Sequence, residues 1–260
     1  MRTRAVGVPA VHLAAAVAVL WTLLLAGCAS STPESTRKSG PLHHYQLSRM
    51  YYEQGRDQEA LDEIERSLRA DRGLPQVWFY RGYIFWNLGK WKAAEQSFRE
   101  ALARNPYFTD ARMWLATCLE KEGDVPGALA QLDQAAEDRS FATPEKIHLT
   151  KALILERQDR LDEALAALRT AVTVRPRFYD AHYEMALVLT KLNRLDEATL
   201  SFDAAEPGYA KDPEFHYRRG EALFRMRRRQ EAARELRRAL ELAPGSEAAA
   251  KAGQLLKEIG

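Results

Sequence analysis

Four histidines occupy the same place in a repeating pattern, and imidazole is both a common zinc ligand and a common general base. His148, His182 and His216 follow one another at intervals of 34 residues, and His44 holds the equivalent place earlier in the chain. Equivalent residues of successive helical repeats are expected about 10 Å apart, the packing distance of helices. Zinc needs each ligand nitrogen within about 2.1 Å. We therefore expect no shared metal site and assign these rings to packing positions.

A second candidate for chemistry is a run of arginines near the end of the chain. The spacing of Glu221 from Arg225 and of Glu235 from Arg238 predicts that part of this charge is paired along helix faces. Residues 227–229 fall in a predicted turn without such partners. They form either a solvated surface, the interpretation we favour, or a contact for anionic lipid head groups or an acidic partner. The run comprises Arg218, Arg219, Arg225, Arg227, Arg228, Arg229, Arg234, Arg237 and Arg238.

Sequence motifs for catalysis are missing. The chain has no phosphate-binding loop, no dinucleotide-binding glycine pattern, no paired-cysteine metal motif and no nucleophile elbow. We therefore predict that the protein is not an enzyme, binds no metal or cofactor and has no small-molecule substrate. Its 38 Lys and Arg residues against 36 Asp and Glu residues create no strong field, so nucleic acid is not an expected partner.

The elements that must position these residues come from a 34-residue pattern that occurs six times. Apolar or small residues recur three or four apart within each copy, which is typical of one face of each of two amphipathic helices. A turn is predicted at positions 14 to 16, where Gly55 and Gly89 supply the left-handed residue that ends a helix. Small side chains at positions 8, 20 and 27 allow the two backbones to approach. They are Ser48, Gly82, Ala116, Ala152, Ala186 and Gly220 at position 8, Ala60, Ala94, Ala128, Ala164, Ala198 and Ala232 at position 20, and Ser67, Ala101, Ala135, Ala171, Ala205 and Ala239 at position 27.

This pattern resembles the tetratricopeptide repeat family. The resemblance is carried in the second copy by Trp78, Gly82, Phe85, Ala94, Phe98, Ala101 and Pro106. It implies an all-α fold, a right-handed α-solenoid of six tetratricopeptide repeats plus a C-terminal capping helix, with a row of interfaces in place of one central core. The predicted repeats are residues 41–74, 75–108, 109–142, 145–178, 179–212 and 213–246, and residues 247–260 form the predicted cap.

The resemblance places positions 2, 5, 6, 9, 12 and 13 of each repeat on the inner surface of the solenoid. In the first three repeats these positions are strongly aromatic, and we predict that they bind an apolar strip of a protein partner, such as one face of an amphipathic helix. The alternative is that several of these side chains pack between repeats. A clamp for peptide carboxylates would need Lys, Asn and Arg on this surface. It is not supported, because positions 2, 6 and 9 hold Leu42, Gln46 and Arg49 in the first repeat and Gln76, Tyr80 and Tyr83 in the second. The predicted partner-binding residues are Tyr45, Tyr52, Phe79, Tyr80, Tyr83, Trp86, Met113 and Trp114.

The start of the chain has the pattern of a secretory signal. A basic beginning precedes an apolar run at residues 13–25, which is too short to span a bilayer comfortably. The end of this run, Leu25-Ala26-Gly27-Cys28, resembles the lipobox of bacterial lipoproteins. The resemblance implies that residues 1–27 are removed and that Cys28 carries a covalent lipid. The alternative is an ordinary signal peptide with an incidental cysteine.

Two further expectations concern the mature chain. Ala29 follows the lipobox cysteine where Asp would imply retention, so the family's sorting rule implies a lipid-anchored protein at the outer membrane that faces the periplasm. Residues 28–40 are polar and predict a flexible tether with a reach of roughly 20 Å. Cys118 then has no cysteine partner, and its helix-interior position predicts a buried, apolar role without a disulfide.

The frame of the repeats slips by two residues between the third and fourth copies, at Thr143-Pro144. Thr143 is suited to cap the next helix and Pro144 to its first turn. Three repeats, the break Phe141-Ala142-Thr143-Pro144, three more repeats, a tether and a lipobox together resemble the pilotin family of type IV pilus systems, the PilF, PilW and Tgl type.

The resemblance to pilotins implies a non-enzymatic outer-membrane lipoprotein. Such a protein binds the secretin subunit of a type IV pilus machine and promotes its localisation or multimer assembly. The alternative is a general periplasmic scaffold for cell-wall enzymes or for outer-membrane protein assembly, since the same fold and anchor serve that role.

Overall fold

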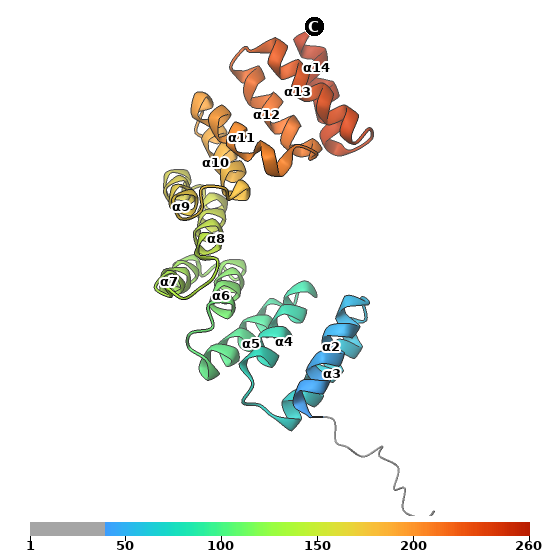
Figure 1. The fold of residues 1–260 in the computed structure, drawn as a ribbon, viewed down its shortest axis with the longest axis vertical. Coiled ribbons are helices and arrows are strands. Elements are labelled where there is room, and N and C mark those ends of the chain that lie inside the picture. The colour runs from blue at the N-terminus through green and yellow to red at the C-terminus, as the bar shows by residue number, and fades with distance from the viewer. Residues whose placement is uncertain (1–39) are drawn as a thin grey trace, which may run out of the picture.

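The computed structural model describes residues 40–260, which form thirteen helices and, in that range, no strand. Twelve of the helices form six helix-turn-helix pairs, and the thirteenth follows the last pair (Figure 1). The pairs are α2 (Pro41–Glu53) with α3 (Asp57–Ala70), α4 (Pro75–Asn87) with α5 (Trp91–Arg104), α6 (Thr109–Lys121) with α7 (Val125–Ala136), α8 (Pro144–Arg157) with α9 (Leu161–Val174), α10 (Tyr179–Lys191) with α11 (Leu195–Tyr209), and α12 (Pro213–Arg225) with α13 (Arg229–Leu242). The last helix is α14 (Glu247–Ile259).

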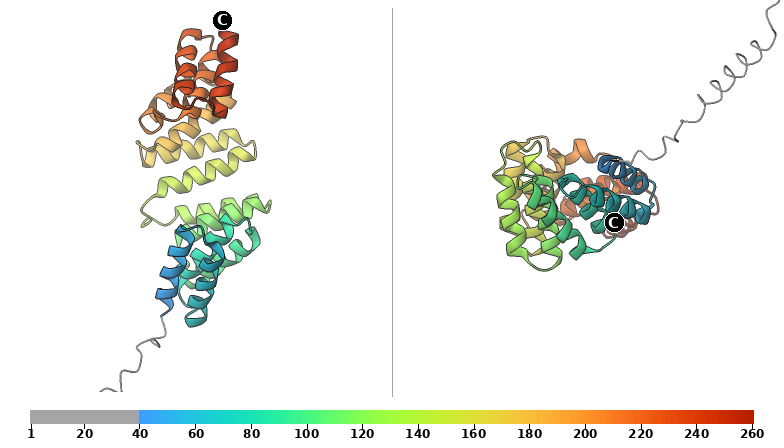
Figure 2. Two further views of the ribbon diagram at one scale, coloured as in Figure 1. Left: turned by 90° about the vertical axis from the view of Figure 1, so that its right-hand side faces the viewer. Right: turned by 90° about the horizontal axis from the view of Figure 1, so that it is seen from below.

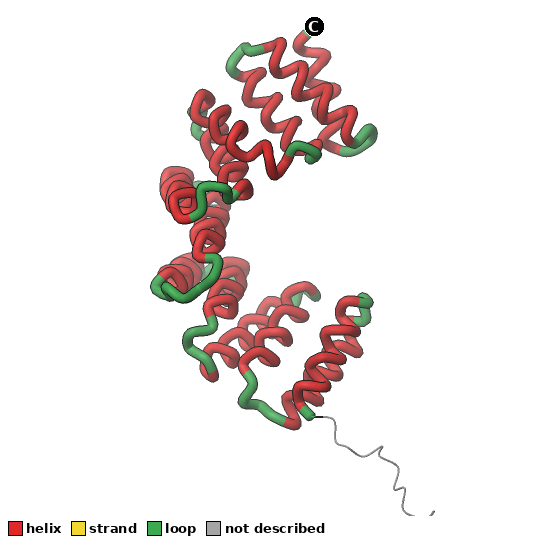
Figure 3. The backbone as a smooth tube through the Cα atoms, in the orientation of Figure 1, coloured by secondary structure: helices red, strands yellow, loops and turns green. Residues whose placement is uncertain are grey.

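The six pairs stack into a right-handed solenoid, so the predicted fold class is confirmed. They follow an open arc from the N-terminal pair to the C-terminal pair (Figure 1), and short loops join successive helices (Figure 3). In a view turned by 90°, the pairs lie as tilted layers along the long axis (Figure 2). The buried apolar residues accordingly form several clusters along the array, each shared by neighbouring repeats.

Small side chains bring the two helices of each pair together, as predicted. Alanine at position 20 has no exposed surface in any of the six repeats. A Cβ atom added to Gly82 would lie 2.7 Å from Cε1 of Phe98, and one added to Gly220 would lie 2.8 Å from Cγ of Leu236. Since real Cβ contacts are longer than this, only glycine allows the α4–α5 and α12–α13 approaches seen here.

Each turn between paired helices contains a residue with positive φ at position 15. Gly55 and Gly89 have φ angles of 72° and 70°, which confirms the predicted left-handed turn. In the last three repeats the position is held by other residue types, which adopt the left-handed region at some cost. These residues are Asp159, Asn193 and Arg227.

The two-residue slip is accommodated before α8. Thr143 occupies the N-cap position and Pro144 is the first residue of the helix, but the Thr143 side chain makes no capping hydrogen bond. The cap prediction for its hydroxyl is therefore wrong. Proline has no backbone N–H group, but this costs nothing at the first position of a helix, because the first N–H groups have no intrahelical partner.

Helix α14 covers the open end of the last repeat. Ser246 caps it, since its hydroxyl oxygen accepts a hydrogen bond of 3.1 Å from the backbone N–H of Ala249. Ala252 is fully buried against Leu236 of α13, whereas Ala250 is exposed. The polar face of the helix points to water, as a terminal cap requires.

The signal peptide predicted at residues 1–27, the lipidation predicted at Cys28 and all but the last residue of the predicted tether lie outside the described residues. Among residues 40–260, no helix combines the length and the apolar character needed to cross a membrane.

Candidate partner-binding groove

Aromatic side chains from the first three repeats form a continuous row across helices α2, α4 and α6. The rings of Tyr52 and Tyr83 lie 5.6 Å apart between centroids, and those of Tyr83 and Trp114 lie 5.4 Å apart. Tyr80 joins the row at 5.6 Å from Tyr45. Edge-to-face pairs at these distances are favourable, so the rings support one another across repeat boundaries. The structure thus brings together most of the residues predicted from their repeat positions.

The row extends to the turn of the second repeat. The ring of Trp86 lies 5.5 Å from Trp114 and 4.6 Å from Trp91, the first residue of α5. Trp91 is 36% exposed and was not among the predicted residues. The prediction missed it because Trp91 lies on the second helix of its repeat, and only positions of the first helix were assigned to the inner surface.

Phe79 packs differently from the other predicted residues. Its ring lies 5.7 Å from the fully buried Phe98 and 4.9 Å from Phe108. Phe79 therefore packs between repeats, which is the alternative to partner binding for these aromatic positions. Its neighbour Tyr80 lies in the row with Tyr45 and Tyr83.

A cavity of about 400 Å³ lies where α6, α8 and α10 meet, next to the aromatic row. Trp114 belongs to both features, so the cavity continues the row toward the C-terminal repeats. Its volume falls within the range of about 300 to 1,000 Å³ that is typical of ligand pockets. The apolar part of the lining consists of Met113, Trp114, Leu149, Leu153 and Phe178, and the polar part consists of Asp110, Thr117, Lys146, Thr150 and Asp180.

Ionic contacts replace the aromatic row in the C-terminal repeats. Nε of Arg157 donates to Oε1 of Glu120 at 2.8 Å. One repeat later, Nζ of Lys191 lies 2.8 Å from Oε1 of Glu156. Each pair joins position 12 of one repeat to position 13 of the next. These contacts hold successive first helices together, and their cations already have partners within the chain.

Three of the four histidines, His44, His182 and His216, make separate contacts, each within or next to its own repeat. Nδ1 of His44 lies 2.6 Å from Glu63, and Nδ1 of His216 lies 2.7 Å from Glu235. Nε2 of His182 lies 2.9 Å from the backbone oxygen of Pro176. The part of the chain that the structure describes contains no group of three or more His, Cys, Asp or Glu side chains that could hold a metal ion.

The arginine run of the last repeat is more fully paired than its spacing predicts. Arg225 donates to the backbone oxygen of Thr190 at 2.9 Å and to Oδ1 of Asn193 at 2.8 Å, not to Glu221. Arg228, expected to lack a partner, lies 2.6 Å from Glu231. The helix-face pairs predicted for Arg225 and Arg238 are therefore wrong, since Arg238 contacts Glu241 instead.

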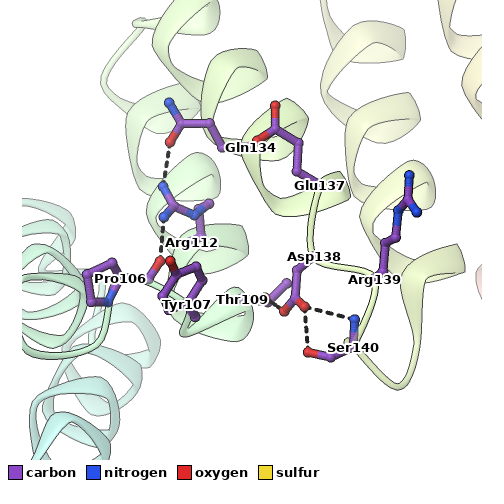
Figure 4. A pocket seen from close by; sticks show the side chains of 9 residues that line it. All are labelled: Pro106, Tyr107, Thr109, Arg112, Gln134, Glu137, Asp138, Arg139 and Ser140. Carbon is purple, nitrogen blue, oxygen red and sulfur yellow. Dashed lines mark hydrogen bonds between the residues drawn. The ribbon is translucent and has the colours of Figure 1, made fainter.

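Another cavity, of about 820 Å³, lies beside the loop that carries the frame slip (Figure 4). Arg112 donates to Oε1 of Gln134 at 2.5 Å and to the backbone oxygen of Pro106 at 2.6 Å. Asp138 accepts hydrogen bonds from Thr109 and from Ser140. Because these polar groups satisfy one another, the cavity is better explained as the outer side of a well-bonded loop than as a binding site.

Cys118 is fully buried on α6, as predicted, and its thiol is free among the described residues. Burial raises the pKa of this thiol to about 12. The thiol is therefore protonated at neutral pH and unsuited to nucleophilic chemistry.

Glu184, on the inner side of α10, carries the most perturbed carboxyl group of the groove. Burial, followed by the nearby carboxylate of Glu156, raises its pKa from 4.5 to about 7, although Lys191 opposes the shift. Between these two pH values the folded protein holds a proton that the unfolded chain has lost. The free energy of unfolding therefore falls as the pH rises through this window.

We expect Glu184→Gln to stabilise the protein at about pH 8 by on the order of 2 kcal/mol, with a smaller gain at about pH 5. Urea unfolding followed by circular dichroism at the two pH values measures the difference. Glu137→Gln, an exposed position outside the groove, is the matched control and should change stability little at either pH. An equal effect of Glu184→Gln at both pH values would contradict the raised pKa of Glu184.

The six helical pairs and their open inner surface define a helical-repeat scaffold, a class whose members contact protein partners along the solenoid. A family model described as tetratricopeptide repeat matches residues 79–143 and 149–213, and a second model of the same description matches residues 213–246. The chain belongs to the tetratricopeptide repeat family. Its general role is therefore that of a scaffold or adaptor in protein–protein interaction.

Solved structures of similar fold include PilW, described as a widely conserved type IV pilus biogenesis factor. It has a TM-score of 0.72 and 21% identity over 83% of this chain and 98% of that chain. PilF of Pseudomonas aeruginosa has a TM-score of 0.70 and 17% identity over 84% of this chain and 97% of that chain. Yeast Tom70 has a TM-score of 0.65 and 16% identity over 85% of this chain and 47% of that chain. Among curated proteins, none matches this sequence.

Proposed function

We propose that this protein is a pilotin, a lipid-anchored and non-enzymatic protein of the outer membrane that binds the secretin subunit of a type IV pilus machine. Binding promotes the localisation of the secretin or its assembly into a multimer. The observation that carries the proposal is the aromatic row on the inner surface of the first three repeats, which offers an apolar segment of a partner a continuous surface.

Two further observations support this function over a general scaffold. The likeness to PilW and PilF extends over nearly the whole length of both proteins, and PilW is described as a type IV pilus biogenesis factor. The lipobox-like sequence ending at Cys28 would also hold the solenoid at a membrane surface. Restricting two partners to one surface raises their effective concentration, so assembly is favoured without any additional contact.

Deletion of the gene tests the proposed function. We expect secretin multimers that resist detergent to fall by about tenfold or more, because effective concentration alone can contribute a factor of about 10² to 10⁴. Immunoblotting of outer-membrane fractions measures multimers and monomers, and the full-length gene supplied in trans should restore the multimers. Unchanged multimers in the deletion strain would exclude a pilotin role and favour the scaffold for other periplasmic machines.

A further inference from the structure

The cavity between α6, α8 and α10 has carboxylates along one rim, at position 2 of successive repeats. Asp110 and Asp180 hold this position in the third and fifth repeats, and Lys146 holds it in the fourth. Glu184 lies one helical turn after Asp180, near the carboxylate of Glu156. The lining of the cavity itself therefore carries two carboxylates, Asp110 and Asp180, and one cation, Lys146.

The carboxylates at this rim lack cationic partners in direct contact. Within residues 40–260, Asp110 and Glu184 form no hydrogen bond or ion pair, and Asp180 accepts only from the hydroxyl of Tyr209 at 2.8 Å. Partial burial raises the pKa of Asp110, as it does that of Glu184. Both shifts have the direction expected of carboxylates that are partly removed from water without enough compensating donors.

The nearby cations, by contrast, are already engaged. Lys191 is held by Glu156 at 2.8 Å, and Arg157 is held by Glu120 at 2.8 Å. Arg218, further along the groove, lies 2.7 Å from Glu214. Within the cavity lining, Lys146 is the cation, and its ammonium group forms no ion pair or side-chain hydrogen bond among the described residues. A ligand that brings its own positive charge therefore fits this surface better than one that brings a carboxylate.

We propose that this central cavity binds a peptide segment of the partner in which a lysine or arginine stands next to a large aliphatic or aromatic residue. The apolar side chain covers Met113, Leu149 and Leu153, and the cation reaches the carboxylates of the cavity rim, Asp110 and Asp180. Lysine and arginine suit this arrangement because their alkyl stems lie on apolar surface while their charged ends reach a polar rim. The inference rests on the proposed function only in taking the groove as the partner-binding surface.

The continuity of the groove indicates a peptide rather than a small molecule. Trp114 lines the cavity and also contacts Tyr83 and Trp86 of the aromatic row. The row and the cavity together extend over the first five repeats, so an occupant that covers both must be long, as a helical or extended segment is. We therefore expect its apolar residues to lie over the first three repeats and its basic residue over the cavity.

Selection of short random peptides displayed on phage tests this chemistry directly, with the full chain purified in detergent as the target. We expect the selected peptides to be enriched in lysine or arginine beside leucine, methionine or an aromatic residue, relative to the unselected library. Enrichment of acidic residues, or no enrichment of basic ones, would overturn the proposal.

Variants of the protein then locate the contact with one selected peptide. Asp110→Asn combined with Asp180→Asn, which keeps an acceptor for the hydroxyl of Tyr209, should weaken its binding about tenfold, and should weaken a version with the basic residue changed to methionine much less. Lys146→Met should strengthen binding of the basic peptide, since it removes the competing cation. Glu137→Gln, outside the groove, is the matched control and should leave binding unchanged. Unchanged binding in the double variant would refute the proposal that these carboxylates contact the basic residue of the peptide.

Folding and function can be separated in these measurements. An unchanged circular dichroism spectrum of the double variant shows that a loss of peptide binding does not report unfolding. If gene deletion leaves secretin multimers intact while the peptides behave as expected, the pilotin function fails and the cavity chemistry stands. If multimers fall but the selected peptides lack basic residues, the cavity chemistry fails and the pilotin function stands.

Discussion

Replacing Tyr83 and Trp86 together by alanine is expected to reduce secretin multimers about tenfold or more while the protein stays folded and membrane-bound. Both rings are half-buried and join the second repeat to Trp114 of the third. Aromatic residues at the centre of an interface often contribute 2 kcal/mol or more each, and about 1.4 kcal/mol corresponds to a tenfold change in affinity. Immunoblotting of multimers in cells that carry the variant measures the effect.

Two control variants separate loss of the binding surface from general damage. Tyr83→Phe with Trp86→Phe keeps an aromatic surface, so we expect multimers close to those of the unaltered protein. Tyr107→Ala with Leu200→Ala removes two apolar side chains that are 85% and 68% exposed outside the groove, and should also have little effect. If the alanine double variant forms normal multimers and its circular dichroism is unchanged, the aromatic row is not part of the binding surface.

Replacing Cys28 by alanine is expected to move nearly all of the protein from the membrane fraction to the periplasm. Each buried CH₂ group of an acyl chain contributes about 0.8 kcal/mol, so several chains on one cysteine hold a protein almost permanently. Fractionation and immunoblotting measure the distribution, and labelling with an alkyne analogue of palmitate should give no signal in the variant. Secretin multimers should fall as well, because the two partners no longer share one surface.

The chain supplies its own control for this anchor. Cys118, the second of its two cysteines, is fully buried in α6, and Cys118→Ala should leave both the membrane fraction and the label unchanged. Ala29→Asp tests the sorting rule separately and is expected to shift the lipidated protein to the inner membrane in a density gradient. Membrane association that survives Cys28→Ala would contradict the lipid anchor.

Much of the aromatic row could be predicted from repeat positions, but the neighbours Phe79 and Tyr80 mark the limit of that approach. Both occupy inner positions of the second repeat, yet Phe79 packs on the buried Phe98 and Tyr80 joins Tyr45 and Tyr83. Position alone does not distinguish them, because the direction of each ring depends on the neighbouring repeat. Trp91 was missed for a related reason, since it reaches the row from a second helix.

Charged residues show the same limit more strongly. Local spacing predicted that Arg225 pairs with Glu221, whereas Arg225 contacts Thr190 and Asn193 of the preceding repeat. The pairs Glu120–Arg157 and Glu156–Lys191 likewise cross a repeat boundary. A pattern that compares residues three or four apart cannot detect such contacts.

The sequence by itself determined the solenoid, its six repeats and the small-residue positions, because each helical pair contacts only its neighbours and a local period therefore specifies the whole stack. Only the tertiary structure decided which inner side chains form one surface and which carboxylates of that surface lack partners. The physical reason is that these properties depend on how each repeat is rotated and displaced relative to the next. That rotation places Trp114 against Tyr83 and leaves Asp110 and Glu184 without a cation in contact.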